Sequence, residues 1–277
     1  MDIESLKPWI GRTETGEDRL MPQSLAGLAA LLDHEAPPWP SGEVPPLGHW
    51  LAFLPNARQS ELGSDGHPRL GGFLPPVPLP RRMWAGSRID FLKPIAIGEA
   101  IERRSAIVDI RHKQGGAGDL VFVTLRHEIS ANGEIAVVDE QDIVYRGHVG
   151  TAPAPRPAAP LPADIVRPHA PDPIQLFRFS ALTFNGHRIH YDRDYARMVE
   201  GYGGLVVHGP FQATLLMDHF LRAAGVRRVR RFAFVARRAL FDMAPFDLCL
   251  AWAPGGARLW TRGGDGLPAL TAELTAD

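Results

Sequence analysis

The chain repeats one order of predicted elements, a helix followed by a run of strands. In the first half, Met21–Asp33 has the apolar spacing of a helix, and strands are predicted over residues 87–145. In the second half, Pro210–Gly225 predicts a mostly apolar helix, and four strand-like runs follow up to Leu274. A strongly apolar helix needs burial on most sides, and a curled antiparallel sheet provides it. The repeat therefore predicts an α+β fold built from two such units.

A stretch rich in proline and alanine, residues 151–173, separates the two repeats. Proline fixes φ and has no amide hydrogen, so this stretch is expected to be stiff and extended. The sequence thus predicts an N-terminal unit over residues 1–150, a linker over 151–173 and a C-terminal unit over 174–277.

Charge and cysteine content exclude several kinds of function. The 277 residues carry a net charge of −1, which gives no support for a nucleic acid or an anionic membrane surface as partner. The single cysteine, Cys249, rules out an internal disulfide and a cysteine-built zinc site, and its apolar surroundings predict a buried thiol. Apolar runs are shorter than the roughly 18–20 residues that span a bilayer, so we expect a soluble, cytoplasmic protein.

Residues 56–86 are rich in glycine and proline, which disfavours regular structure and favours extended chain. Two interpretations remain open. The segment is a surface loop, or it lies over a bound substrate, with Arg81 and Arg82 offered to an anion and Trp84 to a flat ring.

The densest group of chemically versatile side chains lies in Phe179–Ala196, which contains two histidines, an asparagine and several carboxylates. Val206–Phe211 follows shortly afterwards and has the character of a helix start. The first turn of a helix carries unpaired main-chain N–H groups and the positive end of the helix dipole. This combination can build a site for a polarised carbonyl group.

The same stretch resembles the signature of MaoC-like (R)-specific enoyl-thioester hydratases, Ser-Gly-Asp-x-Asn-Pro-(Leu/Ile)-His-x-Asp-x-x-x-Ala. Aligned without gaps, the direct matches are Ile189, His190, Asp192 and Ala196. Thr183 and Phe184 take the places of Ser and Gly, His187 and Arg188 those of Asn and Pro, and Asn185 that of the catalytic Asp. Val206-Val-His-Gly-Pro is similar to the start of that family's central helix.

The resemblance implies a double hotdog fold, in which each unit is a central helix wrapped by a curled sheet. Together with the Asp65–Trp84 loop, it is greatest to 3-methylfumaryl-CoA (mesaconyl-C4-CoA) hydratases, and type 2 hydroxyacyl-thioester dehydratases are similar too. It implies reversible hydration of an enoyl-CoA thioester, such as 3-methylfumaryl-CoA to citramalyl-CoA, without any cofactor beyond the coenzyme A of the substrate. If the segment before residue 87 lies over the substrate, this coenzyme A would contact Arg81, Arg82 and Trp84. A homodimer is expected by analogy, with one site per chain shaped by both halves.

Three other functions remain open for this sequence. One is dehydration of 3-hydroxyacyl chains on a carrier protein, and another is thioester hydrolysis, since hotdog proteins include thioesterases. The third is a non-catalytic acyl-thioester-binding module, which the replacement of the family aspartate by Asn185 would permit.

In the hydratase interpretation, His190 is the general base, because histidine transfers protons near neutral pH. Asn185 would accept a hydrogen bond from the reacting water, but an amide cannot take a proton. Either His190 does the acid–base work alone or another group substitutes for the carboxylate. By sequence proximity, the candidates are Asp192, Asp194 and His187.

The helix start is expected to polarise the thioester carbonyl. Pro210 has no N–H, so the donors would be Gly209, Phe211 or Gln212, and glycine allows a close approach of the thioester. His208 is either a second site residue or only a helix cap.

Two further hypotheses concern charged groups in the motif. Arg188 could bind a distal carboxylate of the substrate or form an ion pair with Asp192 or Asp194. A metal site built from His187, His190, Asp192 and His208 has enough ligands, but the spacing is not that of a standard pair on a helix. Because hydration next to a thioester needs no metal, none is expected.

Overall fold

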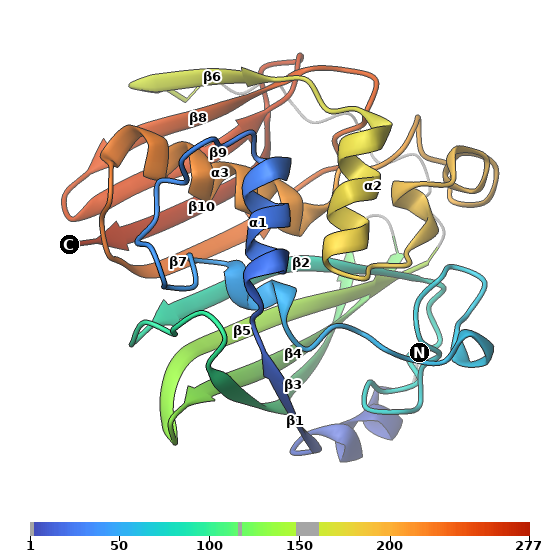
Figure 1. The fold of residues 1–277 in the computed structure, drawn as a ribbon. Helices are drawn as coiled ribbons and strands as arrows, with labels where there is room; N and C mark the ends of the chain where they lie inside the picture. The colour runs from blue at the N-terminus through green and yellow to red at the C-terminus, as the bar shows by residue number, and fades with distance from the viewer. Residues whose placement is uncertain (1–2, 116–117, 148–160) are drawn as a thin grey trace.

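The computed structural model describes residues 3–115, 118–147 and 161–277. These residues form one antiparallel sheet of ten strands in the order β1-β3-β4-β5-β2-β7-β10-β9-β8-β6 (Figure 1). The two halves of the chain join where β2 pairs with β7. The strands are β1 (Thr13–Arg19), β2 (Arg81–Phe91), β3 (Ala100–Gly115), β4 (Gly118–Ala131), β5 (Glu134–Arg146), β6 (Ile165–His169), β7 (Val229–Ala236), β8 (Phe246–Ala253), β9 (Gly256–Arg262) and β10 (Pro268–Ala276).

The C-terminal half wraps its sheet around one long helix, α3 (Gly209–Ala224). Every residue from Phe211 to Leu221 is buried, and α3 packs against β8, β9, β10 and β2. Gly225 ends the helix at a φ of +71°, where glycine avoids the steric cost of a side chain. The predicted helix and its stop are both confirmed.

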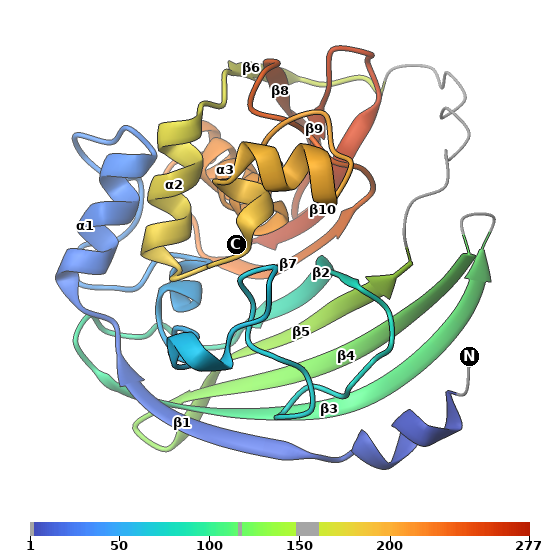
Figure 2. The same ribbon diagram turned by 90° about the vertical axis from the view of Figure 1, so that its right-hand side faces the viewer.

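The N-terminal half has a shorter helix in a different place. Helix α1 (Pro22–Leu31) packs beside α2 (Pro173–Leu182), as both views show (Figures 1 and 2). Its leucines at 25, 28 and 31 are buried in the shared core. Among the described residues of this half, no helix is as long as α3, and α1 packs against α2 and the turn at Gly48–Leu51. Apolar residues of the loop before β2, between positions 70 and 79, pack against side chains of β3, β4 and β5.

Several short elements complete the described chain. They are 3₁₀ turns at Glu4–Trp9, Gln59–Glu61, Gly48–Leu51 and Arg188–His190, and a π turn at Tyr195–Val199. Cys249 is buried on β8, as predicted, and burial raises its pKa to about 11. Within the described residues, no helix combines the length and apolarity needed to cross a membrane.

Two expectations need correction, and a third falls partly outside the described residues. Arg81, Arg82 and Trp84 lie on β2 rather than in a loop, because β2 is a central strand paired with both β5 and β7. Ile165–His169, expected in the linker, forms edge strand β6, where a proline is tolerated because one side of the strand is unpaired. Residues 151–160 of the expected linker lie outside the described residues.

Candidate active site

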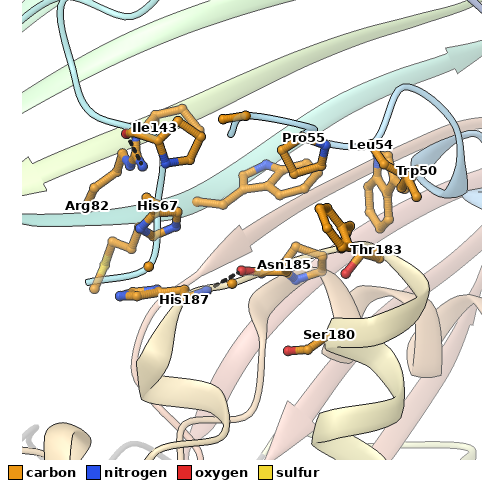
Figure 3. Close-up of a pocket in the computed structure, with 18 of the residues that line it drawn as sticks. Trp50, Leu54, Pro55, His67, Arg82, Ile143, Ser180, Thr183, Asn185 and His187 are labelled. Carbon is orange, nitrogen blue, oxygen red and sulfur yellow. Dashed lines mark hydrogen bonds between the residues drawn. The ribbon is translucent and has the colours of Figure 1, made fainter. Parts of the chain in front are cut away.

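A large open pocket lies between the two halves of the chain (Figure 3). The C-terminal half contributes the end of α2, the turn after it and the start of α3. The N-terminal half contributes the inner face of β2–β5 and the loop before β2. His190 and Asn185, the two residues predicted to be catalytic, both line this pocket.

His190 is buried and held in one orientation. Its Nδ1 lies 2.7 Å from the main-chain oxygen of Val206, which can only accept a hydrogen bond, so Nδ1 carries the proton and Nε2 keeps a free lone pair. Its ring stacks on that of His208, with 3.5 Å between centroids. Burial lowers the pKa of His190 to about 3, against the opposing effect of the Val206 oxygen. The imidazole is therefore neutral at pH 7.

His208 occupies the N-cap position of α3, but its side chain packs against the ring of His190 instead of capping the helix. It is 1% exposed, does not line the pocket and makes no side-chain capping bond. Its Nε2 lies 2.9 Å from the Ser180 hydroxyl on α2, and burial lowers its pKa well below the usual value. His208 is thus fixed by Ser180 on one side and stacked on the His190 ring on the other.

Asn185 sits on the turn after α2, where Phe184 has a φ of +48°. The main-chain N–H of His187 donates to Asn185 Oδ1 at 2.9 Å, and Nδ2 has no partner among the described residues. That geometry leaves the amide N–H₂ free to donate to a water, whereas the sequence predicted an acceptor. The carboxylates of Asp192 and Asp194, proposed as substitutes, lie outside the pocket that holds His190.

The N-terminal half places a second histidine beside this turn. The main-chain N–H of Arg188 donates to the oxygen of Asp65 at 2.9 Å, which ties the two segments together. His67 Nδ1 lies 2.9 Å from Asp65 Oδ2, and its ring centroid is 4.1 Å from that of His187. Figure 3 shows His67 and His187 next to each other on the pocket wall.

The three residues of β2 predicted to bind coenzyme A have different surroundings. Arg81 is buried, forms an ion pair with Glu200 at 2.9 Å and does not line the pocket. Arg82 faces the pocket near His67 and has no carboxylate within ion-pair distance among the described residues (Figure 3). Trp84 packs edge-on against Trp50 at 5.0 Å, so the two indoles line one part of the pocket.

The start of α3 offers two unpaired main-chain donors. The N–H of Gln212 is taken by the oxygen of His208 at 3.0 Å, and its side chain is held by Val207 and Thr261. The N–H groups of Gly209 and Phe211 have no acceptor among the described residues. Gly209 lines the pocket, whereas the Phe211 side chain is fully buried against Phe179. Gly209 is therefore the better-placed donor.

Comparison with known proteins identifies the family. A sequence profile of the type 2 hydroxyacyl-thioester dehydratases matches residues 47–242. The chain is also 48% identical over 271 residues to the mesaconyl-C(4)-CoA hydratase of Chloroflexus aurantiacus, and the match covers 96% of each chain. The protein belongs to this family. It is accordingly a hydro-lyase, as the resemblance in the sequence implied.

Solved structures confirm the double hotdog fold of this family member. HtdX of Mycobacterium tuberculosis superimposes with a TM-score of 0.68 at 21% identity, covering 96% of this chain and 100% of that one. A conserved hypothetical protein of the same organism, described as a double hotdog, gives a TM-score of 0.59 at 15% identity and covers 96% of both chains. The α+β fold class predicted from the repeat is thus confirmed.

Arg188 of this dehydratase-family protein forms the ion pair that the sequence left as an alternative. Its Nη2 lies 2.7 Å from Asp192 Oδ2, and Nη1 donates to the main-chain oxygen of Ser64 at 3.0 Å. The guanidinium also lies over the Tyr195 ring. The positive charge of Arg188 is therefore paired with Asp192, and its hydrogen bond to Ser64 connects the two halves of the site.

Sequence reasoning missed the partners that come from distant segments of the dehydratase fold. Ser180, Asp65 and His67 had no assigned role, although Asp65-Gly-His67 belonged to the loop that resembled the family. One side-chain donor atom from each of Asp65, His67 and His187 lies within 4.8 Å of the others. The metal-ligand set considered from the sequence, His187, His190, Asp192 and His208, is not the group whose ligand atoms meet at this distance among the described residues.

Proposed function

We propose that the protein catalyses the reversible addition of water to an enoyl-CoA thioester that carries a carboxylate, such as 3-methylfumaryl-CoA, to give citramalyl-CoA. The observation that carries this proposal is the buried, neutral His190 with its free Nε2 in a pocket beside the open first turn of α3. The kinship to a mesaconyl-C(4)-CoA hydratase supports the choice of acyl group.

The water is activated by His190 and positioned by Asn185. The Val206 oxygen holds the Nδ1–H tautomer, so Nε2 takes a proton from the water as the oxygen bonds to the β-carbon. The free N–H₂ of Asn185 donates to the water oxygen and orients its lone pair. Asn185 itself takes no proton.

The thioester oxygen is stabilised by the N–H of Gly209 as enolate charge develops on it. This donor is fixed by the fold and lies at the positive end of the α3 dipole, so it needs no rearrangement during the reaction. Gly209 lines the pocket and has no side chain, and an added side-chain carbon would lie 3.5 Å from the Trp84 main-chain oxygen. The thioester can therefore approach the main chain closely.

Arg82 is the residue that binds the carboxylate of the substrate. Its guanidinium lies in the pocket beside the histidines, where burial chiefly, and the positive charge of Arg82 in addition, lower the pKa of His67 and His187. Without an acidic partner in the described protein, Arg82 is available for an anion. A β-carboxylate would place the double bond next to His190.

The experiment follows purified protein with 3-methylfumaryl-CoA and crotonyl-CoA, measuring loss of the enoyl-thioester absorbance and release of free thiol in parallel. The expected result is rapid loss of absorbance with the dicarboxylic substrate and no thiol release. Thiol release would show a thioesterase. Turnover of crotonyl-CoA alone would show a fatty-acyl dehydratase, and no change with either substrate would indicate a binding module.

Two smaller parts of the proposal concern partners and cofactors. We expect activity to survive exhaustive dialysis against a chelator, because no step in the proposed reaction uses a metal. We also expect a homodimer by analogy, which light scattering after size exclusion measures directly.

A further inference from the structure

We propose that Asp65 and His67 form a second proton-transfer group, which the N-terminal half supplies in place of the carboxylate missing at Asn185. This inference rests on the proposed hydration reaction and assigns the proton that the α-carbon receives. His190 handles the water, and His67 handles the α-proton.

The geometry is that of a histidine oriented by a carboxylate. Asp65 Oδ2 lies 2.9 Å from His67 Nδ1, and Asp65 Oδ1 accepts the main-chain N–H of His67 at 3.0 Å. The carboxylate keeps the proton on Nδ1, so Nε2 is the atom that can exchange a proton. Nε2 has no hydrogen-bond partner among the described residues, and His67 lines the pocket.

The segment that carries this pair is fixed against the catalytic turn. Gly66 has a φ of +89°, and a side chain there would overlap the main-chain oxygen of Gly186. A side-chain carbon at Gly186 would in turn lie 2.7 Å from the main-chain oxygen of Gly66. Arg188 also donates two hydrogen bonds, to the main-chain oxygens of Asp65 and Ser64. The close contact of the two glycines and these two bonds together hold the Asp65–His67 pair in place.

The three histidines form a row along the pocket wall. The ring centroids of His67 and His187 are 4.1 Å apart, and those of His187 and His190 are 5.4 Å apart. His67 is the member of this row that has a carboxylate partner. The negatively charged carboxylate of Asp65 stabilises the imidazolium form of His67. The uncharged main-chain oxygen bonded to His190 stabilises the imidazolium form of that residue less.

The reaction balances with two histidines. His190 Nε2 takes one proton from water as the oxygen bonds to the β-carbon, and the electron pair of the double bond moves onto the thioester as an enolate. The enolate then takes a proton from Nε2 of the His67 imidazolium, which returns to neutral. Exchange of one proton between the site and solvent restores both histidines. In dehydration, His67 removes the α-proton and His190 protonates the leaving hydroxyl.

Substrate binding would favour the acidic form of His67. Burial and the positive charge of Arg82 lower the His67 pKa, while the bond to Asp65 raises it. A substrate carboxylate bound to Arg82 would neutralise that charge and raise the His67 pKa. The acid would then be charged chiefly when a dicarboxylic substrate is in place.

The test replaces Asp65 by Asn and, separately, His67 by Ala, and measures kcat, KM and the isotope effect with citramalyl-CoA deuterated at the α-carbon. We expect kcat to fall about 100-fold in His67→Ala, while KM changes little. The isotope effect on kcat should rise, because breaking the α-C–H bond becomes slower. Added imidazole should restore part of the activity of His67→Ala by occupying the vacated space.

The matched control is a second Asp–His pair in the same half, His112 and Asp119, whose Nε2 and Oδ1 lie 2.7 Å apart outside the pocket. His112→Ala and Asp119→Asn should leave kcat and the isotope effect unchanged.

Four outcomes would overturn the proposal. Normal kcat in His67→Ala would remove His67 from the chemistry. A loss of activity without imidazole rescue and with an unchanged isotope effect would make the pair structural. Inactivation of the wild type by a chelator, reversed by zinc, would indicate a metal held by Asp65, His67 and His187. A wild type that hydrates neither thioester would overturn the hydration reaction itself, which distinguishes that failure from a failure of the pair alone.

Discussion

The two halves of the molecule use the same kind of sheet for different purposes. In the C-terminal half, the sheet closes around α3, which is buried from Phe211 to Leu221 and fills the inner face of the sheet. In the N-terminal half, the inner face of β4 and β5 instead lines the pocket, with Leu125, Ile129 and Ile143 among the lining residues. The absence of a long helix there, among the described residues, leaves the room that a substrate needs.

The two halves also contribute different residues to the site, those around His190 from one half and most of those that face the substrate from the other. Residues that hold His190 come from α2, from the motif and from the start of α3, all in the C-terminal half. Arg82, Trp84 and His67, which face the acyl group in our proposal, come from the N-terminal half. Changes at Arg82 should therefore alter substrate preference, and changes around His190 should alter the reaction itself. His67 belongs to the N-terminal half but is proposed to take part in the proton transfer, so its replacement should also lower kcat.

The largest effect is expected for His190→Gln. Glutamine keeps a polar side chain but cannot act as a base, so kcat for the proposed hydration should fall by about 10²–10⁴-fold. Rates with 3-methylfumaryl-CoA and crotonyl-CoA should fall in parallel, because the C-terminal half serves both. A kcat within a few-fold of the wild type would remove His190 from its role.

Replacement of Arg82 by Met should alter preference rather than chemistry. Loss of the guanidinium should raise KM for 3-methylfumaryl-CoA by roughly 10–100-fold, as expected for a lost charged hydrogen bond, while KM for crotonyl-CoA changes little. Arg104→Met, at an exposed arginine of β3, is the control and should change neither value. Equal effects of Arg82→Met on both substrates would refute a carboxylate-binding role.

Gly66→Ala tests the contact between the halves. Its side chain would overlap the Gly186 oxygen, so the segment carrying His67 must move, and we expect kcat to fall about ten-fold if His67 takes part in proton transfer. Gly71→Ala is the matched control, since Gly71 has a similar φ of +95° with nothing within 4 Å. Both variants carry the backbone strain, and only the first carries the clash. Equal activities of the two variants would show that the close contact between Gly66 and Gly186 is not needed for catalysis.

The smallest expected effect is on the pH dependence of stability. The folded-state pKa of His190 is about 3, below the unfolded value of about 6.5, so the neutral residue stabilises the fold above pH 6.5 and this contribution is lost as pH falls. The free energy of unfolding can be measured with urea at pH 7 and at pH 5.5. Between these two pH values it should fall by about 1 kcal/mol less in His190→Gln than in the wild type. An unchanged drop would show that His190 is not held neutral.

Periodic features of the sequence were sufficient to predict α3, its stop at Gly225 and the strands on either side of it. A long apolar run and a glycine report local structure directly. Strand β6 was missed because its proline content is typical of a linker, and its pairing with β8 depends on a distant segment. Arg81 pairs with Glu200 whereas Arg82 faces the pocket, because successive side chains of a strand point to opposite faces of the sheet. The proline-rich sequence before β2 does not reveal that this segment is a strand.

The candidate site was predictable only in its local part. His190, Asn185 and Gly209 lie within or just after one motif, so their proximity follows from spacing and from the resemblance to hydratases. Asp65 and His67 are more than a hundred residues away and reach the site through the close contact of two glycines. A contact of this kind leaves no periodic signal in the sequence.

The most direct test of the hydration reaction is to run it in oxygen-18 water with 3-methylfumaryl-CoA and analyse the products by mass spectrometry. The proposed chemistry predicts an intact CoA thioester with the label in a new hydroxyl group on the β-carbon. Label in a newly formed carboxylate, together with free coenzyme A, would show hydrolysis and would contradict the proposed function.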